Sequence, residues 1–468
     1  DLLAYSVTSS GVAPFPVWRA SEHIPPPENR KIFTRSGGGG KEFRWTELSQ
    51  ADQSAIGSQD VLNFLRGDRS KEGGTFRTRG SSVLGDIVHS SPLYVKDSNT
   101  VYVGANDGML HAFDASTGVE LFAYVPSQSI PKMNNLSDVR YGTAALPHTY
   151  FVDGEINVST RSQTTGRNYL VAALGHGGKG LFALDVTNPA GFSASNVLWE
   201  YFDAADADLG YMIGRPIIAK MNDGSSAVIV GNGYGSTNGR AVLYILDLTT
   251  GSLLKKIDTG AAGSNMLSSP GVFDSDGNGT IDYIYAGDLK GNVWKFDVSG
   301  TDRSSWGVAL SGDPLFTAVD PGNVPQPITA PVTIVVDDVA GDLNYGKRFI
   351  FFGTGSYFRS GDPSDMQIQS WYGLIDDNAR ISGRSALKER TVQMEGRVNG
   401  YPVRTFSEAV AGDMAGKKGW YIDLKTAGGV AQGERIVTES KYYKLAEPTL
   451  IASSIIPVVD PCVPGGTG

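Results

Sequence analysis

The sequence predicts an all-β protein, a modified β-propeller of about seven blades, each an antiparallel sheet of four strands. Glycine and proline are abundant, with 59 and 23 residues among 468, which favours short strands and tight turns over long helices. A strand–turn–strand unit also recurs along the chain with a period of roughly 40–50 residues, as propeller blades do. No apolar run approaches the roughly 18–20 residues of a membrane span.

The first 80 residues are expected to form an irregular appendage. Ser58 has the chemistry of a helix N-cap, and the apolar residues between positions 61 and 65 would share one face of the short helix that follows. Such a face must pack on another element. We therefore assign residues 1–80 to an appendage that packs on the propeller and residues 81–468 to the propeller itself.

The repeated unit has a constant internal order. It consists of a strand after proline, a turn, a strand that ends in glycine, a second turn and a strand that ends in aspartate. Four units begin near residues 90, 215, 268 and 330. Degenerate units are expected at residues 169–201 and in the C-terminal stretch 419–452. The final strand is expected to pair within the first blade, because closure removes exposed sheet edges.

An acidic loop enlarges the first turn of the unit that begins near residue 268. Asp274, Asp276 and Asn278 place side-chain oxygens at alternate positions, Thr280 would contribute its carbonyl oxygen, and Asp282 adds a carboxylate. Hard Ca²⁺ takes six to eight oxygen ligands, and loops with this spacing provide them. The sequence therefore predicts that these five residues bind Ca²⁺.

The loop differs from an EF-hand in two ways. The twelfth position is Tyr285, where an EF-hand has a bidentate Glu, and the flanking residues are β-formers, so the loop is expected between strands. The alternative is an empty acidic turn, since Asp, Asn and Gly are ordinary turn residues. The corresponding turns at residues 222–224 and 337–342 lack the alternate spacing and are expected to be solvated.

Arg66, Gly67 and Asp68 have the composition of an integrin-binding tripeptide. Recognition by a receptor needs an exposed loop tip. The alternative, which we favour, is structural: Gly67 ends the preceding helix while Arg66 and Asp68 make local ion pairs.

Composition excludes several classes of function. The net charge of −9 provides no basic footprint for nucleic acid or an anionic membrane. The single cysteine, Cys462, rules out an internal disulfide and a cysteine-based zinc site, and its own partner is not assigned. No catalytic motif indicates an enzyme or a small-molecule substrate. Four of the five histidines are scattered at blade-like positions, and they show no close pair or metalloprotease spacing, so a transition-metal site is not expected; they are His89, His111, His148 and His176.

Five motifs occur together along the chain. They are Phe-Leu-Arg-Gly-Asp-Arg-Ser at residues 64–70, Ser-Val-Leu-Gly-Asp-Ile-Val-His-Ser-Ser-Pro at 82–92, the unit at 104–118, the glycine-rich strand entry at 175–185, and the acidic loop at 274–282. In this combination, from about residue 30 to at least residue 300, the chain resembles the C-terminal domain of the PilY-type type IV pilus biogenesis adhesins.

The resemblance implies a modified propeller at the bacterial cell surface or pilus tip, outer-membrane associated or secreted. It implies that Ca²⁺ in the loop matching residues 274–282 controls pilus extension against retraction, and so twitching motility, with further roles in surface attachment. Pilins are the implied partners, and a host integrin for some members. A signal peptide and a variable N-terminal region, often von Willebrand A-like, are expected to be missing from this piece.

A quinoprotein-like dehydrogenase is the rival interpretation, because residues 105–108 and 114–118 also resemble that class of propeller. Such enzymes commonly use an adjacent cysteine pair and regularly spaced tryptophan docking motifs. This chain has one cysteine, and its seven tryptophans do not fall once per unit. A third interpretation is a structural propeller in which Ca²⁺ only stabilises a loop.

Overall fold

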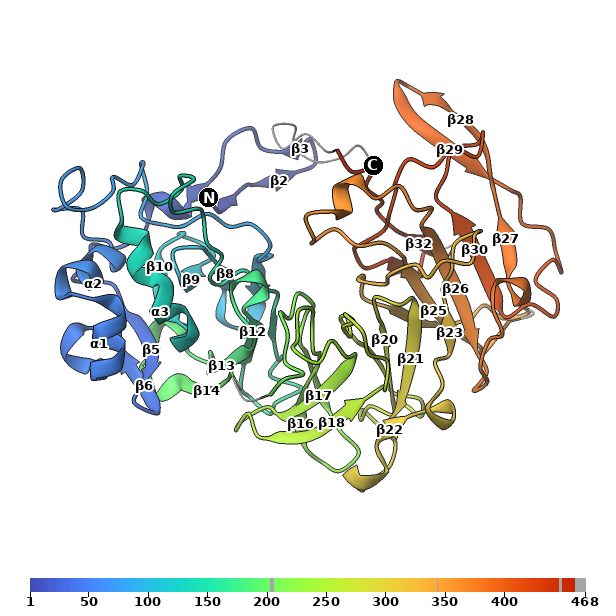
Figure 1. Cartoon of the computed structure of the whole chain (residues 1–468), viewed down its shortest axis with the longest axis horizontal. Helices are drawn as coiled ribbons and strands as arrows, with labels where there is room; N and C mark the ends of the chain where they lie inside the picture. The colour runs from blue at the N-terminus through green and yellow to red at the C-terminus, as the bar shows by residue number, and fades with distance from the viewer. Residues whose placement is uncertain (203–205, 343, 446–447, 459–468) are drawn as a thin grey trace. The chain divides into compact units, whose positions relative to one another are not determined.

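The computed structural model describes residues 1–202, 206–342, 344–445 and 448–458 (Figure 1). Cys462 lies outside these residues. The chain divides into two compact units, one made of Asp1–Ala219, Ser226–Ile229 and Ile245–Leu254, the other of Lys220–Ser225, Val230–Tyr244 and Lys255–Gly468.

The first sheet contains six strands in the order β6-β5-β10-β9-β8-β7. Their bounds are β5 (Ile32–Ser36), β6 (Gly39–Glu42), β7 (Leu93–Val95), β8 (Thr100–Gly104), β9 (Leu110–Asp114) and β10 (Glu120–Val125). The four strands β7 to β10 pair antiparallel, as a blade does. β5 pairs in parallel with β10, with Ile32 opposite Ala123, so the N-terminal region supplies two strands of this sheet.

Three short helices lie beside β5 and β6 in Figure 1: α1 (Gln50–Ile56), α2 (Gln59–Leu65) and α3 (Ile130–Met133). The Ser58 hydroxyl accepts a hydrogen bond of 3.2 Å from the Val61 N–H, which is the capping contact that the sequence predicted. Ile56, Phe64 and Met133 are buried in one apolar cluster with Ile32. The helices therefore pack on the first sheet.

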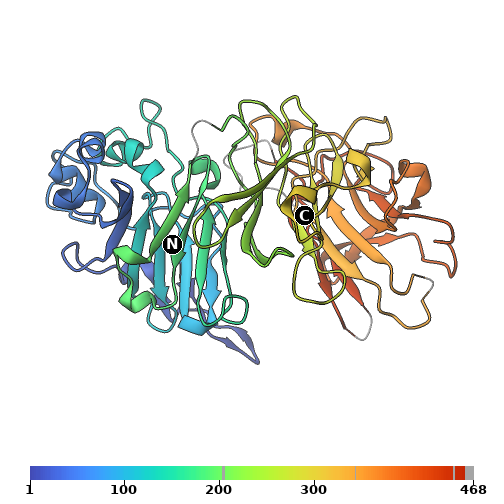
Figure 2. The same cartoon turned by 90° about the horizontal axis from the view of Figure 1, so that it is seen from below.

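Three further sheets follow along the chain, seen from another side in Figure 2. The next sheet contains β11 (Ile156–Val158), β12 (Tyr169–Ala173), β13 (Leu181–Asp185) and β14 (Val197–Tyr201). It is followed by β15 (Ile217–Lys220), β16 (Ser226–Gly231), β17 (Val242–Asp247) and β18 (Leu253–Asp258). The third contains β19 (Gly271–Phe273), β20 (Tyr283–Gly287), β21 (Asn292–Asp297), β22 (Gly307–Val308) and β23 (Phe316–Thr317). The predicted all-β, propeller-like fold of four-stranded sheets is confirmed.

The last large sheet corrects the predicted number of blades. It has the order β24-β25-β26-β30-β27, with β24 (Thr333–Val336), β25 (Arg348–Gly353), β26 (Ser370–Asp376), β27 (Lys388–Arg390) and β30 (Gly419–Asp423). The strand expected to start a separate C-terminal unit is therefore the fourth strand of this sheet. Its place in the chain is delayed by an insertion that carries the hairpin of β28 (Val392–Val398) and β29 (Tyr401–Phe406). The described residues form five sheets of four or more strands, not seven.

The final strand also differs from expectation. β32 (Thr449–Ile451) pairs with β31 (Lys441–Tyr443) and not within the first sheet. At the other end, β1 (Leu3–Ala4) pairs with β4 (Trp18–Arg19), and β2 (Val7–Thr8) with β3 (Gly11–Val12).

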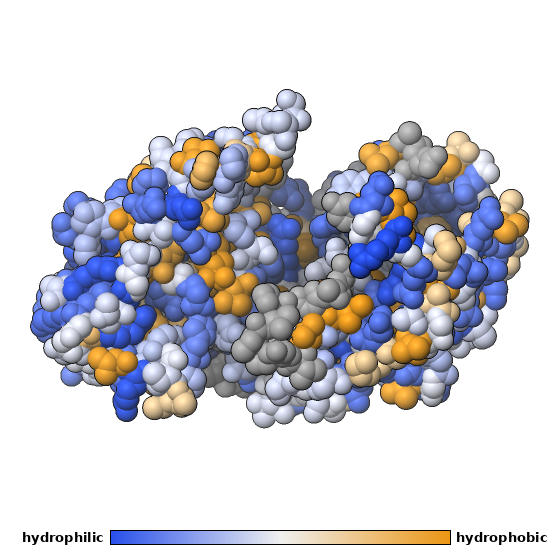
Figure 3. Space-filling view, turned by 90° about the horizontal axis from the view of Figure 1, so that it is seen from above, coloured by the Kyte–Doolittle hydropathy of each residue, from blue (hydrophilic) through white to orange (hydrophobic). Residues whose placement is uncertain are grey.

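No helix within the described residues is long and apolar enough to cross a bilayer. On the face shown in Figure 3, hydrophobic residues occur as small groups among hydrophilic ones.

Three tryptophans dock on corresponding turns, each at the end of the third strand of a sheet. Each indole N–H donates to a backbone carbonyl of that turn: Trp18 to Ala115 at 2.9 Å, Trp199 to Leu248 at 2.8 Å and Trp306 to Gly300 at 2.7 Å. In the first two turns the ring also requires a glycine, because a Cβ at Gly118 or Gly251 would lie 2.7 or 2.6 Å from it. Tryptophan therefore fixes some blade turns although it does not recur once per unit.

Candidate metal centre

The acidic loop connects β19 to β20, as expected for a loop flanked by strands. Phe273 pairs with Tyr283 at its base, and the Asp282 N–H closes the loop by donating to the Phe273 carbonyl at 3.0 Å. Gly277 and Gly279 have φ of +76° and +88°, a left-handed conformation that favours glycine. The two glycines let the chain curl back over its own carboxylates.

The structure brings the three predicted carboxylates together. Asp274, Asp276 and Asp282 each offer a ligand oxygen, and these oxygens all lie within 4.8 Å of one another. Asp276 is exposed, Asp274 is half-buried and Asp282 is only 5% exposed. One face of the cluster is thus anchored in the protein while the other is open to solvent.

Backbone N–H groups hold the first carboxylate in place. Asp274 accepts hydrogen bonds of 2.7 Å at each oxygen, one from the Gly277 N–H and one from the Gly279 N–H. Burial alone would raise the pKa of Asp274, but these donors outweigh it and the pKa lies below its ordinary value. The carboxylate is therefore an anion at neutral pH and is oriented toward the loop.

Of the remaining predicted ligands, Asp276 and Asn278 are exposed and Thr280 is half-buried. Asp276 accepts from the Asn278 N–H at 3.1 Å and from its side-chain amide at 3.0 Å. The Asn278 side-chain oxygen Oδ1 accepts from the Thr280 N–H at 2.7 Å. Tyr285, at the twelfth position, is buried in β20, where its hydroxyl accepts from Arg348 at 2.6 Å. The side chain at the twelfth position is therefore engaged elsewhere and supplies no ligand to the loop.

Asn222, in the turn between β15 and β16, contacts the loop in a way that sequence reasoning missed. Its amide donates to Asp282 Oδ1 at 3.0 Å and to the Ile281 carbonyl at 2.9 Å, and its side-chain oxygen accepts from the Thr280 hydroxyl at 2.8 Å. The only signal in the sequence was that residues 222–224 occupy the same turn of the preceding unit. That turn was expected to be merely solvated.

Ser275 completes the environment of Asp282. Its N–H and hydroxyl both donate to Asp282 Oδ2, at 2.8 and 2.6 Å. Burial would raise the pKa of Asp282 and the Asp274 carboxylate adds to this, yet the Ser275 and Asn222 donors prevail and lower it. The Asp274 and Asp282 carboxylates are therefore both held in place as anions, which favours binding of a cation.

Comparison with known proteins places the chain in a family. The family model described as the PilY1 beta-propeller domain matches residues 84–396, two-thirds of the chain. The chain belongs to this family.

The relatives that the chain matches are named as pilus biogenesis factors. A type IV pilus biogenesis factor PilY1 homolog of Xylella fastidiosa is 38% identical over the whole chain, which spans 38% of that protein. The type IV pilus biogenesis factor PilY1 of Pseudomonas aeruginosa strain UCBPP-PA14 is 33% identical, with 47% of its length covered. The crystal structure of the Pseudomonas aeruginosa PilY1 C-terminal domain superposes with a TM-score of 0.62 at 32% identity, covering 76% of each chain. The chain thus spans less than half of these curated PilY1 relatives, and the resemblance inferred from its motifs is confirmed.

The tripeptide Arg66-Gly67-Asp68 of this PilY1-family propeller lies at the end of α2. Arg66 is 5% exposed. Its guanidinium donates to three carbonyl oxygens, of Pro27 at 2.8 Å, Arg30 at 2.9 Å and Phe43 at 3.0 Å. Burial lowers its pKa to about 10. Gly67 has φ of +114° and ends the helix as expected, but Arg66 contacts carbonyl groups where ion pairs were predicted. This geometry favours the structural interpretation.

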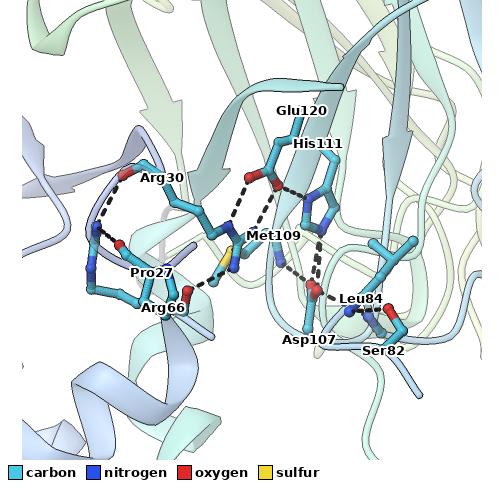
Figure 4. Close-up of polar contacts among 10 residues, drawn as sticks. Pro27, Arg30, Arg66, Ser82, Leu84, Asp107, Met109, His111 and Glu120 are labelled. Carbon is cyan, nitrogen blue, oxygen red and sulfur yellow. Dashed lines mark hydrogen bonds and ion pairs between the residues drawn. The ribbon is translucent and has the colours of Figure 1, made fainter. Parts of the chain in front are cut away.

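A buried charge network adjoins Arg66 in the PilY1-family first sheet (Figure 4). Arg30 donates to the Arg66 carbonyl at 3.0 Å and makes two hydrogen bonds of 2.7 Å to Glu120. Glu120 also contacts His111 Nδ1 at 2.8 Å, and His111 Nε2 lies 3.1 Å from Asp107. Burial would lower the pKa of His111, but the two carboxylates raise it to about 9. Burial would likewise raise the pKa of Glu120, which Arg30 and His111 instead lower to about 2. The sequence did not predict this network.

Proposed function

We propose that the loop at residues 274–282 binds Ca²⁺ through Asp274, Asp276, Asn278, Thr280 and Asp282. The observation that carries this proposal is the convergence of three carboxylates within 4.8 Å on a loop whose ligand atoms are all oxygen. Hard Ca²⁺ prefers such oxygen ligands and tolerates an irregular sphere completed by water. By analogy with sensor loops of similar ligand charge, we expect a Kd of about 10⁻⁷–10⁻⁵ M.

The proposed role of the ion is regulatory. Asp276 is exposed to solvent, so an ion in the loop can exchange with solvent. Asp282 is buried, so the presence or absence of the ion would change the interactions of the buried residues around it. The neighbouring turn at Asn222 shares hydrogen bonds with the same loop and would sense its conformation. We propose that calcium occupancy shifts the balance between pilus extension and retraction, and so twitching motility.

The proposed setting is the bacterial cell surface or the pilus tip, with pilins as partners and surface attachment as a further role. Support comes from the relatives, which are named type IV pilus biogenesis factors. We propose no catalysis for this domain. The interpretation of Arg66-Gly67-Asp68 as an integrin ligand stays a prediction, which the burial of Arg66 disfavours.

Calorimetry with CaCl₂ tests the binding proposal. Asp276→Ala removes an exposed carboxylate and should lower calcium affinity by about 10-fold or more without unfolding the domain. Asp342→Ala is the matched control, because it removes an exposed carboxylate from the turn between β24 and β25. Equal calcium affinity in the wild type and Asp276→Ala would rule out the assignment.

Pilus counts test the regulatory proposal separately. Cells that carry Asp276→Ala or Asp282→Ala, at matched protein level, should change in pilus number and twitching motility. If calcium binding is lost while pilus number stays at the wild-type value, the ion is only a structural element of the loop.

A further inference from the structure

Two histidines and an aspartate converge in the compact unit that does not contain the acidic loop. His89 Nδ1 lies 2.6 Å from Asp153 Oδ2, and His176 Nδ1 lies 3.1 Å from the same oxygen. Each residue offers one ligand atom, and these atoms all lie within 4.8 Å of one another. The two imidazole rings are stacked, with centroids 4.5 Å apart.

We propose that His89, Asp153 and His176 form a binding site for a divalent transition metal of the Zn²⁺ class. Two imidazole nitrogens and one carboxylate oxygen are a ligand set that Zn²⁺ takes in proteins. Ca²⁺ prefers oxygen alone, so the chemistry separates this site from the acidic loop. At metal–ligand distances of about 2.0–2.1 Å, tetrahedral ligand atoms stand roughly 3.3 Å apart, so the two contacts need to open by less than about 1 Å.

The backbone holds the carboxylate where such a site needs it. Asp153 is nearly fully buried. Its Oδ1 accepts a hydrogen bond of 3.1 Å from the backbone N–H of His89, and its own backbone N–H donates to the Leu174 carbonyl at 3.2 Å. One carboxylate oxygen is thus fixed by the chain while the other faces both imidazoles. Such outer contacts orient a ligand before the metal arrives.

Close backbone packing holds His176 against Asp153. His176 lies between Gly175 and Gly177 in a single helical turn. A Cβ at Gly175 would lie 2.8 Å from the Asp153 carbonyl oxygen, and one at Gly177 would lie 1.6 Å from the Phe151 carbonyl oxygen. Only glycine permits this approach, so the glycine-rich motif at residues 175–180 positions a histidine.

The site is accessible. The His89 side chain is 48% exposed and that of His176 is 16% exposed. Three protein ligands leave one tetrahedral position for water or an external ligand, the arrangement of an open zinc site. Tyr150 borders both histidines, with ring centroids 5.6 and 5.3 Å away.

Sequence reasoning did not expect a transition-metal site because it relied on local spacing. His89 and His176 are distant in the chain, and the fold brings them to one aspartate. The alternative is a set of histidine–carboxylate hydrogen bonds that binds no metal, and the experiment distinguishes the two.

Calorimetry with ZnCl₂ on the full chain, in a Cys462→Ser background that removes the thiol, tests the proposal. We expect one Zn²⁺ per chain, and an affinity loss of at least about 100-fold in His89→Ala and in His176→Gln. His148→Ala is the control, because His148 also contacts Tyr150 but pairs with Asp86. Asp276→Ala should leave zinc affinity unchanged. The absence of zinc binding, or equal loss in His89→Ala and His148→Ala, would overturn the proposal.

Discussion

The side-chain amide of Asn222 donates a hydrogen bond of 3.0 Å to Asp282 Oδ1, so a turn of one sheet holds a proposed calcium ligand of the next. A second contact, from the Ile281 N–H to the Lys220 carbonyl at 2.9 Å, joins the same two segments through the backbone. The position of Asp282 therefore depends on a residue outside the loop.

Asn222→Ala should weaken calcium binding by about 10-fold, the lower end of the effect of removing a residue that orients a metal ligand. The loop keeps all five proposed ligands, but Asp282 and Thr280 lose their shared partner. Calorimetry measures the change, and Asn344→Ala in the turn between β24 and β25 is the control. If both variants bind calcium as the wild type does, Asn222 does not position the site.

Glu120→Ala should destabilise the domain strongly, by about 3–5 kcal/mol, because it leaves the buried Arg30 without its counter-charge and His111 with Asp107 alone. The Arg30 and Glu120 side chains are only 2% and 1% exposed. Urea unfolding of the variant and the wild type measures the difference. Glu42→Ala, which breaks the exposed pair with Arg44, should change the free energy of unfolding far less. Similar losses in the two variants would contradict the buried role of Glu120.

His111 should make stability depend on pH. Its folded pKa of about 9 lies above its ordinary value of 6.5, so its contribution is fully present below pH 6.5 and is lost as pH rises through 9. The free energy of unfolding should therefore decrease between pH 6.5 and 9. His111→Gln should flatten this dependence, and a slope that persists unchanged in the variant would assign it to another group.

Glu120 should act at the acidic end of the range. Its folded pKa of about 2 lies below its ordinary value of 4.5, so its contribution is present above pH 4.5 and is lost as pH falls through 2. Acid unfolding followed by circular dichroism should be less steep below pH 4.5 in Glu120→Gln than in the wild type. Identical acid transitions would show that other carboxylates dominate.

Arg66→Ala should lower the free energy of unfolding by about 2 kcal/mol or more, since it leaves three carbonyl oxygens without their donor.

Asp68→Glu keeps the charge and disrupts integrin recognition, yet it should not change attachment to host cells if Arg66 stays buried. Attachment assays on folded protein check this. Reduced attachment by Asp68→Glu alone would restore the adhesive interpretation.

The strand positions were predictable because proline, glycine and aspartate recur at the same places in each unit. Strands β9, β17 and β30 end at Asp114, Asp247 and Asp423, where the aspartate of the repeated unit placed their ends. The number of sheets was not predictable in the same way. The insertion before β30 separates the third and fourth strands of one sheet, and only pairing in space shows that Trp371 lies opposite Ile422.

The candidate sites show the same division. The carboxylates of the acidic loop are close in sequence, so their spacing predicted their convergence. Asn222 contacts the acidic loop, and His89 and His176 contact Asp153, only in the folded chain. These residues are far apart in the sequence, so no local sequence pattern predicts the contacts. The side-chain contacts of Arg66 could not be predicted from the sequence either, because its burial depends on packing against residues that are distant in the chain.

The parallel pairing of β5 with β10 bears on how this domain can be produced as a recombinant fragment. A fragment that begins at residue 81 would leave the β10 backbone from Ala123 to Val125 as a bare edge and uncover the apolar cluster around Ile32. Bare edges recruit other chains. Such a fragment should elute as aggregates in size-exclusion chromatography, while one that starts before Arg30 should stay monodisperse.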